Sequence, residues 1–213
     1  MAGGRGGAQP AARELEEEVG TDTEDGIIDT LLGLDPLADL PRTGWLLRGV
    51  RPCESIADHS FGVALVALLL TDALRAEGQS VDGERVLRMA LVHDAPEART
   101  GDVPLPSKTA EAEQALAETE ERVARELLPP SLADAWREAE KGATLEARIV
   151  KAADKLQLMI KVLAYERQGR GRLDEFWENP ANFREMGLAL AARLYDRICR
   201  RAGRARPRRA TTA

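Results

Sequence analysis

Two histidines are the residues of this sequence best suited to bind a metal ion, and each lies beside an aspartate. The chain of 213 residues contains only His59 and His93, which occur in the dipeptides Asp58-His59 and His93-Asp94. Imidazole nitrogen and carboxylate oxygen together suit a divalent transition ion such as Mn²⁺, Fe²⁺, Co²⁺ or Zn²⁺. We therefore expect the two dipeptides to meet at one ion and to supply three of its ligands.

A fourth ligand has to come from elsewhere in the chain, and Asp154 is the candidate. It occurs in the segment RIVKAADKLQLMIKVL, in which apolar residues surround it on almost every side of an expected helix. An unpaired buried carboxylate is costly, so Asp154 needs a metal ion, a lysine or an arginine as its partner. The alternative is that both histidines are capping or core residues and that Asp154 forms a structural ion pair. The joint occurrence of these features favours the metal site.

The elements that must position these residues are helices. Ala, Leu, Glu and Arg dominate at helical spacing, aromatic residues are 4% of the chain, and strand-like alternation is hard to find. We therefore expect an all-α fold, a compact bundle of about six or seven helices. Caps and breakers predict helices at residues 27–34, 55–76, 83–101, 107–128, 132–141, 144–168 and 183–202.

Two local signals bear on the metal ligands. Ser55 and Asp58 form a variant of the capping box, which places His59 in the first turn of its helix. Pro96 lacks an N–H group and crowds the preceding turn, so we expect the third helix to kink or loosen beside His93 and Asp94.

The length and composition indicate one domain, residues 23–202, between two tails. Residues 1–22 join Gly-rich MAGGRGGAQP to acidic ELEEEVG, a composition that predicts disorder. Residues 203–213 are basic and interrupted by proline, which predicts a solvated, disordered tail, with RNA or an anionic surface as the alternative contact.

Composition also weighs against several classes of protein. The net charge of -6 gives no general attraction to nucleic acid. Cys53 and Cys199 are too few for a disulfide framework, and the N-terminus lacks the layout of a signal peptide. The longest apolar run, residues 63–70, falls far short of the ~20 residues that cross a bilayer. We expect a soluble cytoplasmic protein without nucleic-acid or membrane partners.

Three segments of the chain resemble the HD-domain 5′-deoxynucleotidases, the bacterial YfbR type and their eukaryotic relatives. They are GWLLRGVRPCESIADHSFGVALVALLL, ALVHDAPEARTGDVP and KAADKLQLMIKV, and the resemblance covers roughly residues 27–194. A lone His-Asp pair has little specificity, but His, then HD-x-x-E-x-x-x-GD, then a later Asp is strongly specific. The resemblance implies an all-helical HD-domain fold, usually a homodimer, that binds one divalent ion and removes phosphate from nucleoside 5′-monophosphates, preferring deoxyribose.

The resemblance also implies roles for individual residues. It places metal ligands at His59, His93, Asp94 and Asp154, and essential acidic residues at Glu97 and Asp102. Any of the four transition ions named above, or Mg²⁺, is a possible occupant, and it would activate a water for attack on the phosphate.

Two acidic residues are expected to act on that water and on the leaving group. Glu97 follows His93 by four residues, so one helical face can present it to the water. We expect Glu97 to activate or orient the water, and Asp102 to protonate the leaving 5′ oxygen or hold the nucleophile, with the division open. The alternatives are a surface carboxylate for Glu97 and a turn residue for Asp102.

The resemblance assigns substrate binding to the segment around Trp45. Arg42 and Arg48 are both candidates for the phosphate, and Lys108 is a third. An indole packed against the sugar would leave little room for a 2′-hydroxyl, which predicts a preference for deoxyribonucleotides. The alternatives are solvated surface cations and, for Trp45, a packing residue.

Other functions of an HD fold remain open in part. Two-metal oxygenases and phosphodiesterases need additional histidines, which this chain lacks. The remaining alternatives are a phosphohydrolase for a modified nucleotide or a nucleoside triphosphate, and a regulatory module that binds nucleotide without turnover.

Overall fold

The structure is a computed structural model that describes residues 11–104 and 110–207, and within them it is helical without a β-strand. This confirms the all-α prediction. The elements are α1 (Ala11–Leu34), η1 (Asp35–Ala38), α2 (Thr43–Leu46), α3 (Ile56–Ala76), α4 (Gly83–Val92), α5 (Glu97–Thr100), α6 (Ala110–Leu127), α7 (Pro130–Lys141), α8 (Leu145–Arg167), α9 (Asp174–Glu178), η3 (Pro180–Asn182) and α10 (Ala189–Ala202). Short helices such as α2, α5 and α9 bring the number above the expected six or seven.

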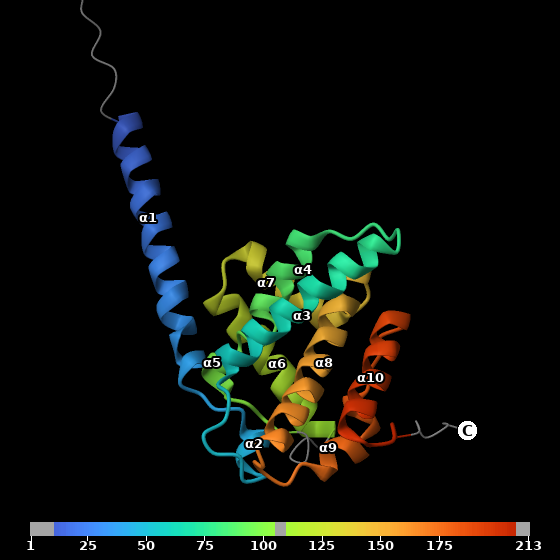
Figure 1. The fold of residues 1–213 in the computed structure, drawn as a ribbon. Helices are drawn as coiled ribbons and strands as arrows, with labels where there is room; N and C mark the ends of the chain where they lie inside the picture. Colours follow the sequence, from blue (N-terminus) through green and yellow to red (C-terminus); the bar gives the residue numbers. More distant parts are fainter. Residues whose placement is uncertain (1–10, 105–109, 208–213) are drawn as a thin grey trace, which may run out of the picture.

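The centre of the bundle is the pair α3 and α8. Both pack against α4. In addition, α7 packs against α4, and α10 packs against α8 (Figure 1). The buried side of α8 is broad, as its sequence predicted, and includes Ala153, Leu156, Met159 and Val162. Because α8 packs against four helices, α3, α4, α7 and α10, a polar residue on its buried face needs a specific partner.

The capping box at the start of α3 is present. The Asp58 N–H donates to Ser55 Oγ at 3.0 Å, and the Ser55 N–H donates to Asp58 Oδ2 at 2.9 Å. His59 follows directly in the first turn and is 1% exposed. The cap therefore sets where α3 begins and directs His59 into the bundle.

The helix expected at residues 83–101 is divided at the proline. α4 ends at Val92, and the chain turns through His93 and Asp94 before α5 begins after Pro96. Gly101 then ends α5 with a φ of 72°, a conformation that favours glycine. The break frees the His93-Asp94 pair from regular helix and turns both side chains toward α8.

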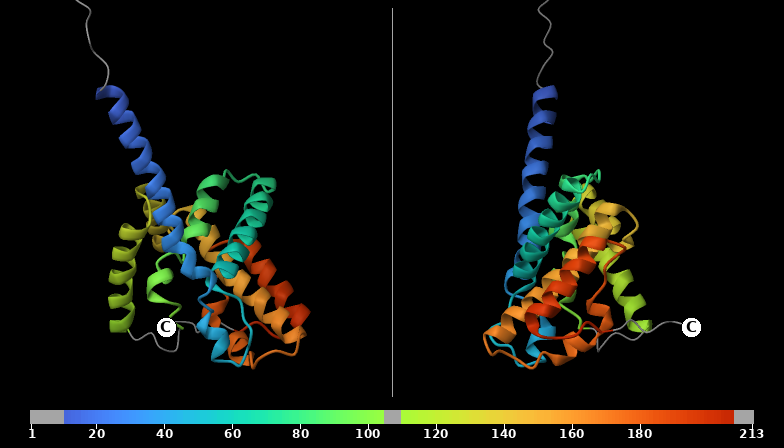
Figure 2. Two further views of the ribbon diagram at one scale, coloured as in Figure 1. Left: turned by 90° about the vertical axis from the view of Figure 1, so that its left-hand side faces the viewer. Right: turned by 45° about the vertical axis from the view of Figure 1, so that its right-hand side comes forward.

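The assigned structure differs from the sequence prediction at the N-terminus. Residues 11–22, expected to be disordered, form the first half of α1, whereas residues 1–10 lie outside the described residues. Ala, Glu, Leu and Arg in AARELEEEV have high helix propensity, which favours a helix over this segment. In both views of Figure 2 the N-terminal half of α1 extends away from the bundle.

The C-terminal end also differs from expectation. The helix predicted at residues 183–202 begins at Ala189, because Pro180 starts a 3₁₀ turn and Met186 and Gly187 both have positive φ. In the expected basic tail, Arg204 pairs with Glu166 and Asp174, and Arg206 pairs with Glu185. Residues 203–207 are thus held against the bundle, and residues 208–213 are outside the described part.

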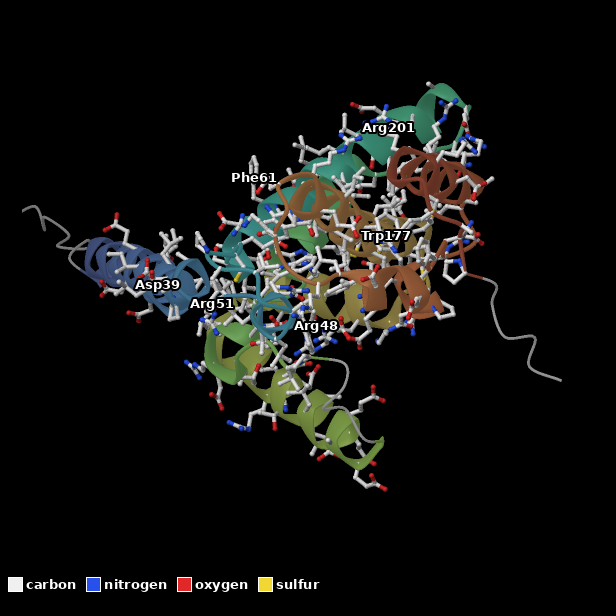
Figure 3. The ribbon with its side chains drawn as sticks, turned by 60° about the horizontal axis from the view of Figure 1, so that its bottom comes forward. Asp39, Arg48, Arg51, Phe61, Trp177 and Arg201 are labelled. Carbon is white, nitrogen blue, oxygen red and sulfur yellow. The ribbon has the colours of Figure 1, made fainter. Side chains whose placement is uncertain are left out.

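Within residues 11–104 and 110–207, one helix, α3, is long and apolar enough to span a membrane, judged by length and composition only. Its inner face is part of the core, where Val63, Ala67, Leu70 and Leu74 are buried. A single apolar helix of this kind is typical of the core of a globular protein and is weak evidence for a membrane span. Its outer face carries exposed Phe61, which points away from the bundle in Figure 3.

Candidate active site

The four predicted metal ligands meet between α3, α8 and the turn after α4. Nε2 of His59 lies 3.4 Å from Asp154 Oδ1 and 3.5 Å from Asp94 Oδ2. Nε2 of His93 lies 3.3 Å from the same Asp94 oxygen. The donor atoms of His59, His93 and Asp154 lie within 4.8 Å of one another. Residues far apart in sequence thus form one nitrogen and oxygen cluster.

The chemistry of this cluster fits a divalent metal ion. Among the described residues, Nε2 of His59 and Nε2 of His93 are buried and have no hydrogen-bond partner. Their other ring nitrogens are engaged: Nδ1 of His59 lies 2.7 Å from Gln157 Oε1, and Nδ1 of His93 lies 2.8 Å from the Ala90 carbonyl. Metal-bound histidines show this arrangement, with one nitrogen held by an acceptor and the other left for the ion.

The electrostatics of the cluster keep its carboxylates ionised. Burial alone would raise the pKa of Asp94, but His93 and Arg42 outweigh it and hold that pKa well below its usual value. Burial opposes ionisation of Asp154 too, and Lys155 helps to reverse the effect, so its pKa is lowered. Despite burial, the two carboxylates raise the pKa of His93. Metal binding would displace the proton from this ring.

Arg42 joins the metal cluster to the two predicted catalytic acids. Its Nη1 lies 3.0 Å from Asp94 Oδ2, 3.5 Å from Asp102 Oδ1 and 3.8 Å from Glu97 Oε2. The backbone places it there, because the Arg42 N–H donates to the Glu54 carbonyl at 3.1 Å beside an isolated antiparallel bridge. The guanidinium therefore provides a positive charge at the centre of an acidic site.

Glu97 and Asp102 differ in how firmly they are held. Asp102 Oδ2 accepts a hydrogen bond from the Thr43 N–H at 2.6 Å, so this carboxylate anchors the start of α2. Glu97 Oε2 is buried and has no hydrogen-bond partner among the described residues. Burial, together with the Asp94 carboxylate, raises the pKa of Glu97 to about 10. Glu97 is thus the acid free to exchange a proton with a ligand.

The candidate phosphate-binding cations occupy different environments. Arg42 lies in the acidic cluster, whereas Arg48 forms two hydrogen bonds to Glu175 Oε2, at 2.6 and 3.2 Å. The Arg48 guanidinium also stacks over the Phe176 ring at 5.5 Å. Of these two arginines, Arg42 is the one that contacts a predicted metal ligand, Asp94. Lys108 lies outside the described residues.

Trp45 is more deeply buried than a sugar-binding indole would be. Its side chain is 1% exposed, its indole N–H donates to Glu54 Oε1 at 2.9 Å, and its ring contacts Tyr165 and Phe176. Some of its atoms still line the cavity described below. Phe176 covers it and is half-buried, so Phe176 offers more surface to a ligand at this wall.

A cavity of about 290 Å³ opens next to the cluster. Its lining includes the polar residues Arg42, His93, Asp94, Glu97, Asp102 and Asp154. Sequence reasoning missed two further cations in its wall, Lys155, which lies 3.1 Å from Asp154 Oδ2, and Lys151, which pairs with Glu140 at 2.7 Å. Lys151 lies three residues before Asp154 and four before Lys155, and this spacing was the available signal, because residues three or four apart share a helix face.

Comparison with known proteins gives one consistent family. The profile of the family described as HD domain matches residues 34–185. The chain is 34% identical to 5′-deoxynucleotidase HDDC2 of Xenopus laevis, covering 68% of this chain and 73% of that protein. It is 32% identical to 5′-deoxynucleotidase hdd1 of Schizosaccharomyces pombe, covering 70% and 76%. The crystal structure of the PH0347 protein from Pyrococcus horikoshii superposes with a TM-score of 0.69 at 37% identity, covering 83% of this chain and 98% of that one.

Proposed function

This chain belongs to the HD-domain family, and on that premise we propose that it is a metal-dependent phosphohydrolase that removes the 5′-phosphate from deoxyribonucleoside monophosphates. The observation that carries the proposal is the buried histidine and aspartate cluster, with its two unpartnered Nε2 atoms, at the wall of a cavity that also holds an arginine and two acids. The relatives named 5′-deoxynucleotidase support the choice of substrate.

We assign His59, His93, Asp94 and Asp154 as the ligands of one divalent ion, Mn²⁺, Co²⁺, Fe²⁺ or Zn²⁺, with Mg²⁺ also possible. Such an ion supplies Lewis-acid chemistry, because it lowers the pKa of water and offsets negative charge that develops on a phosphoryl group. The nitrogen donors favour a transition ion over Mg²⁺, which prefers oxygen ligands.

The residues around the ligands have separate roles in binding the phosphate, orienting the water and positioning other side chains. Arg42 binds the substrate phosphate through its guanidinium, which its carboxylate neighbours keep charged. Glu97 orients the attacking water through Oε2 and accepts its proton in the ionised form, which the nearby Arg42 guanidinium favours. Asp102 positions Arg42 and Thr43 through its two oxygens. Lys155, in the same wall, adds positive charge beside Asp154.

The activity and its sugar preference can be tested together. We expect phosphate release from deoxyribonucleoside 5′-monophosphates in the presence of Mn²⁺ or Co²⁺, with lower kcat/KM for the matched ribonucleotides and little discrimination among bases. Trp45 and Phe176 form the wall that we expect to exclude the 2′-hydroxyl. A screen across deoxy- and ribonucleoside mono-, di- and triphosphates measures this. Turnover of triphosphates alone, or of no nucleotide, would contradict the proposal and favour a specialised substrate or a regulatory role.

The two arginines give a paired prediction for the phosphate. We expect Arg42→Lys to lower kcat/KM by about 10- to 100-fold for deoxy- and ribonucleotides alike, because a lysine retains charge but loses bidentate binding. Arg48→Lys should change kcat/KM by less than about threefold, since Arg48 is held by Glu175. Steady-state kinetics on both variants show which arginine binds the substrate phosphate. The reverse ranking would assign the phosphate to Arg48.

We also propose that the protein acts in the cytoplasm as a homodimer, without membrane or nucleic-acid partners. Support for association comes from an apolar stripe on the outer face of α3, where Phe61, Leu65 and Leu69 are 70%, 48% and 62% exposed. These residues are spaced by four, so they lie along one side of the helix. Ile160, on α8, which packs against α3, is also exposed. Contiguous apolar surface of this kind marks interaction sites.

A further inference from the structure

A buried chain of polar contacts runs from the metal ligand His59 away from the cavity. Nδ1 of His59 lies 2.7 Å from Gln157 Oε1, and Nε2 of Gln157 donates to Glu54 Oε2 at 3.0 Å. The three side chains are 1%, 7% and 4% exposed, respectively. Glu54 also accepts the indole N–H of Trp45 at 2.9 Å and pairs with Lys161 at 3.2 Å.

The direction of each hydrogen bond in this chain is fixed by the carboxylate at its end. The Glu54 carboxylate receives N–H donors from Trp45, Gln157 and Lys161, so it acts only as an acceptor. Gln157 must therefore turn its NH₂ group to Glu54 and its carbonyl oxygen to His59. An amide oxygen can only accept, so the proton of the neutral His59 ring has to sit on Nδ1.

We infer that Gln157 and Glu54 are positioning residues that fix the proton of His59 on Nδ1 and so leave Nε2 free to bind the metal ion. This inference rests on the proposed function, because it concerns the same metal site. The inference adds that the metal affinity of His59 depends on which way the Gln157 amide is turned. It also depends on the Glu54 carboxylate, which fixes the orientation of that amide. Glu54 also anchors Trp45, so the ligand and the cavity wall share one support.

The proton position can be measured directly because the chain has only two histidines. Full-length protein labelled with ¹⁵N-histidine gives four ring-nitrogen signals, which report the tautomer of each ring at a pH where both are neutral. We expect Nδ1–H for His59 in the wild type, with Zn²⁺ binding shifting the Nε2 signal. His93 is the internal reference, because its Nδ1 faces the Ala90 carbonyl and involves neither Gln157 nor Glu54. A wild-type His59 protonated on Nε2 would overturn the inference without any variant.

Two variants test the source of that preference. In Gln157→Leu the acceptor for Nδ1–H is lost, and in Glu54→Gln the new amide can donate or accept, so Gln157 can flip. In both we expect His59 to populate the Nε2–H form, His93 to keep its wild-type tautomer, and Zn²⁺ affinity to fall about 10- to 100-fold in competition titrations. Gln114→Leu, which makes the same change at an exposed site of α6, is the matched control and should leave both readouts unchanged.

The outcomes separate this inference from the proposed function. A wild type that binds no Zn²⁺ or Mn²⁺ contradicts the proposed metal site itself. A wild type that binds metal, combined with folded variants that keep both the Nδ1–H tautomer and the wild-type affinity, contradicts the inference alone. If Gln157→Leu does not fold, Glu54→Gln, which preserves the shape of the side chain, and the wild-type spectrum still decide between the two.

Discussion

We expect His93→Ala and Asp94→Asn to lose the divalent metal ion and all measurable phosphatase activity. His93→Ala removes one of the four donors, and Asp94→Asn replaces a charged carboxylate donor with a neutral amide. Asp94 contributes most, because its Oδ2 lies within 3.5 Å of Nε2 of both His59 and His93 and 3.0 Å from Arg42 Nη1. Losing a ligand also leaves the remaining charged groups buried without their counter-charge. Metal content per chain by elemental analysis, together with phosphate release, measures the effect.

The matched control for this experiment is Asp134→Asn. Asp134 has a 76% exposed side chain, and its partner in the described part of the chain is Arg137 in the same helix, so we expect wild-type metal content and activity. Asparagine is used at residue 94 because it preserves side-chain volume, which limits the change to charge and coordination. The one-ion assignment is wrong if the wild type holds two tightly bound ions per chain, or if either variant retains its full metal content.

The metal ligands could be predicted from sequence because few residues were available to fill the role. With only two histidines, the motif that carries His59, His93 and Asp94 had few other interpretations, and Asp154 was exceptional as a carboxylate in an apolar helix. The comparisons confirm the HD-domain family that these motifs indicated. The ligand assignment itself is a prediction that the geometry supports and that metal analysis must test.

The surroundings of the ligands could not be predicted in the same way. Local sequence does not determine which polar side chain faces which across a bundle, so the contacts of Gln157 with His59 and Glu54 had no signal in the sequence. The sequence offers both Arg42 and Arg48 as phosphate-binding residues. Which of the two lies beside the metal ligands depends on where the chain turns after η1, and the sequence does not predict that turn. Contacts between helices that are far apart in the sequence place these residues. Caps and prolines, in contrast, affect only the turn in which they occur.

Some helix boundaries could be predicted from local sequence, and others could not. The break near Pro96 was predictable because a proline has no N–H to donate, and the start of α3 was predictable from its capping box. The late start of α10 was not, because the positive φ of Met186 has no signal in helix or strand propensity. At residues 11–22 two sequence signals conflict, because the low apolar content predicts disorder whereas the high helix propensity favours the helix that extends α1 to Ala11.

Glu97→Gln should fold, keep its metal ion and lose turnover by about 10²- to 10⁴-fold, the usual contribution of a positioned acid or base. The reason is geometric: Glu97 Oε2 is buried, without a hydrogen-bond partner in the described part of the chain, and lines the cavity beside the ligands. Glutamine has nearly the same shape, so the change removes proton exchange and charge without creating a hole. Steady-state kcat and metal content are measured on the same preparation.

Two further variants separate this role from a structural one. Glu126→Gln makes the same change at a side chain that is 47% exposed and pairs with Arg99, and we expect wild-type kinetics. Asp102→Asn should act mainly through Arg42 and Thr43, so it should raise KM more than it lowers kcat. If Glu97→Gln keeps near-normal kcat, Glu97 does not handle the proton, and an Asp102→Asn variant with the larger loss of kcat would transfer the role to Asp102. If Glu97→Gln instead loses its metal ion, Glu97 belongs among the ligands. Turnover would then fall because the ion is absent, and not because the base is absent.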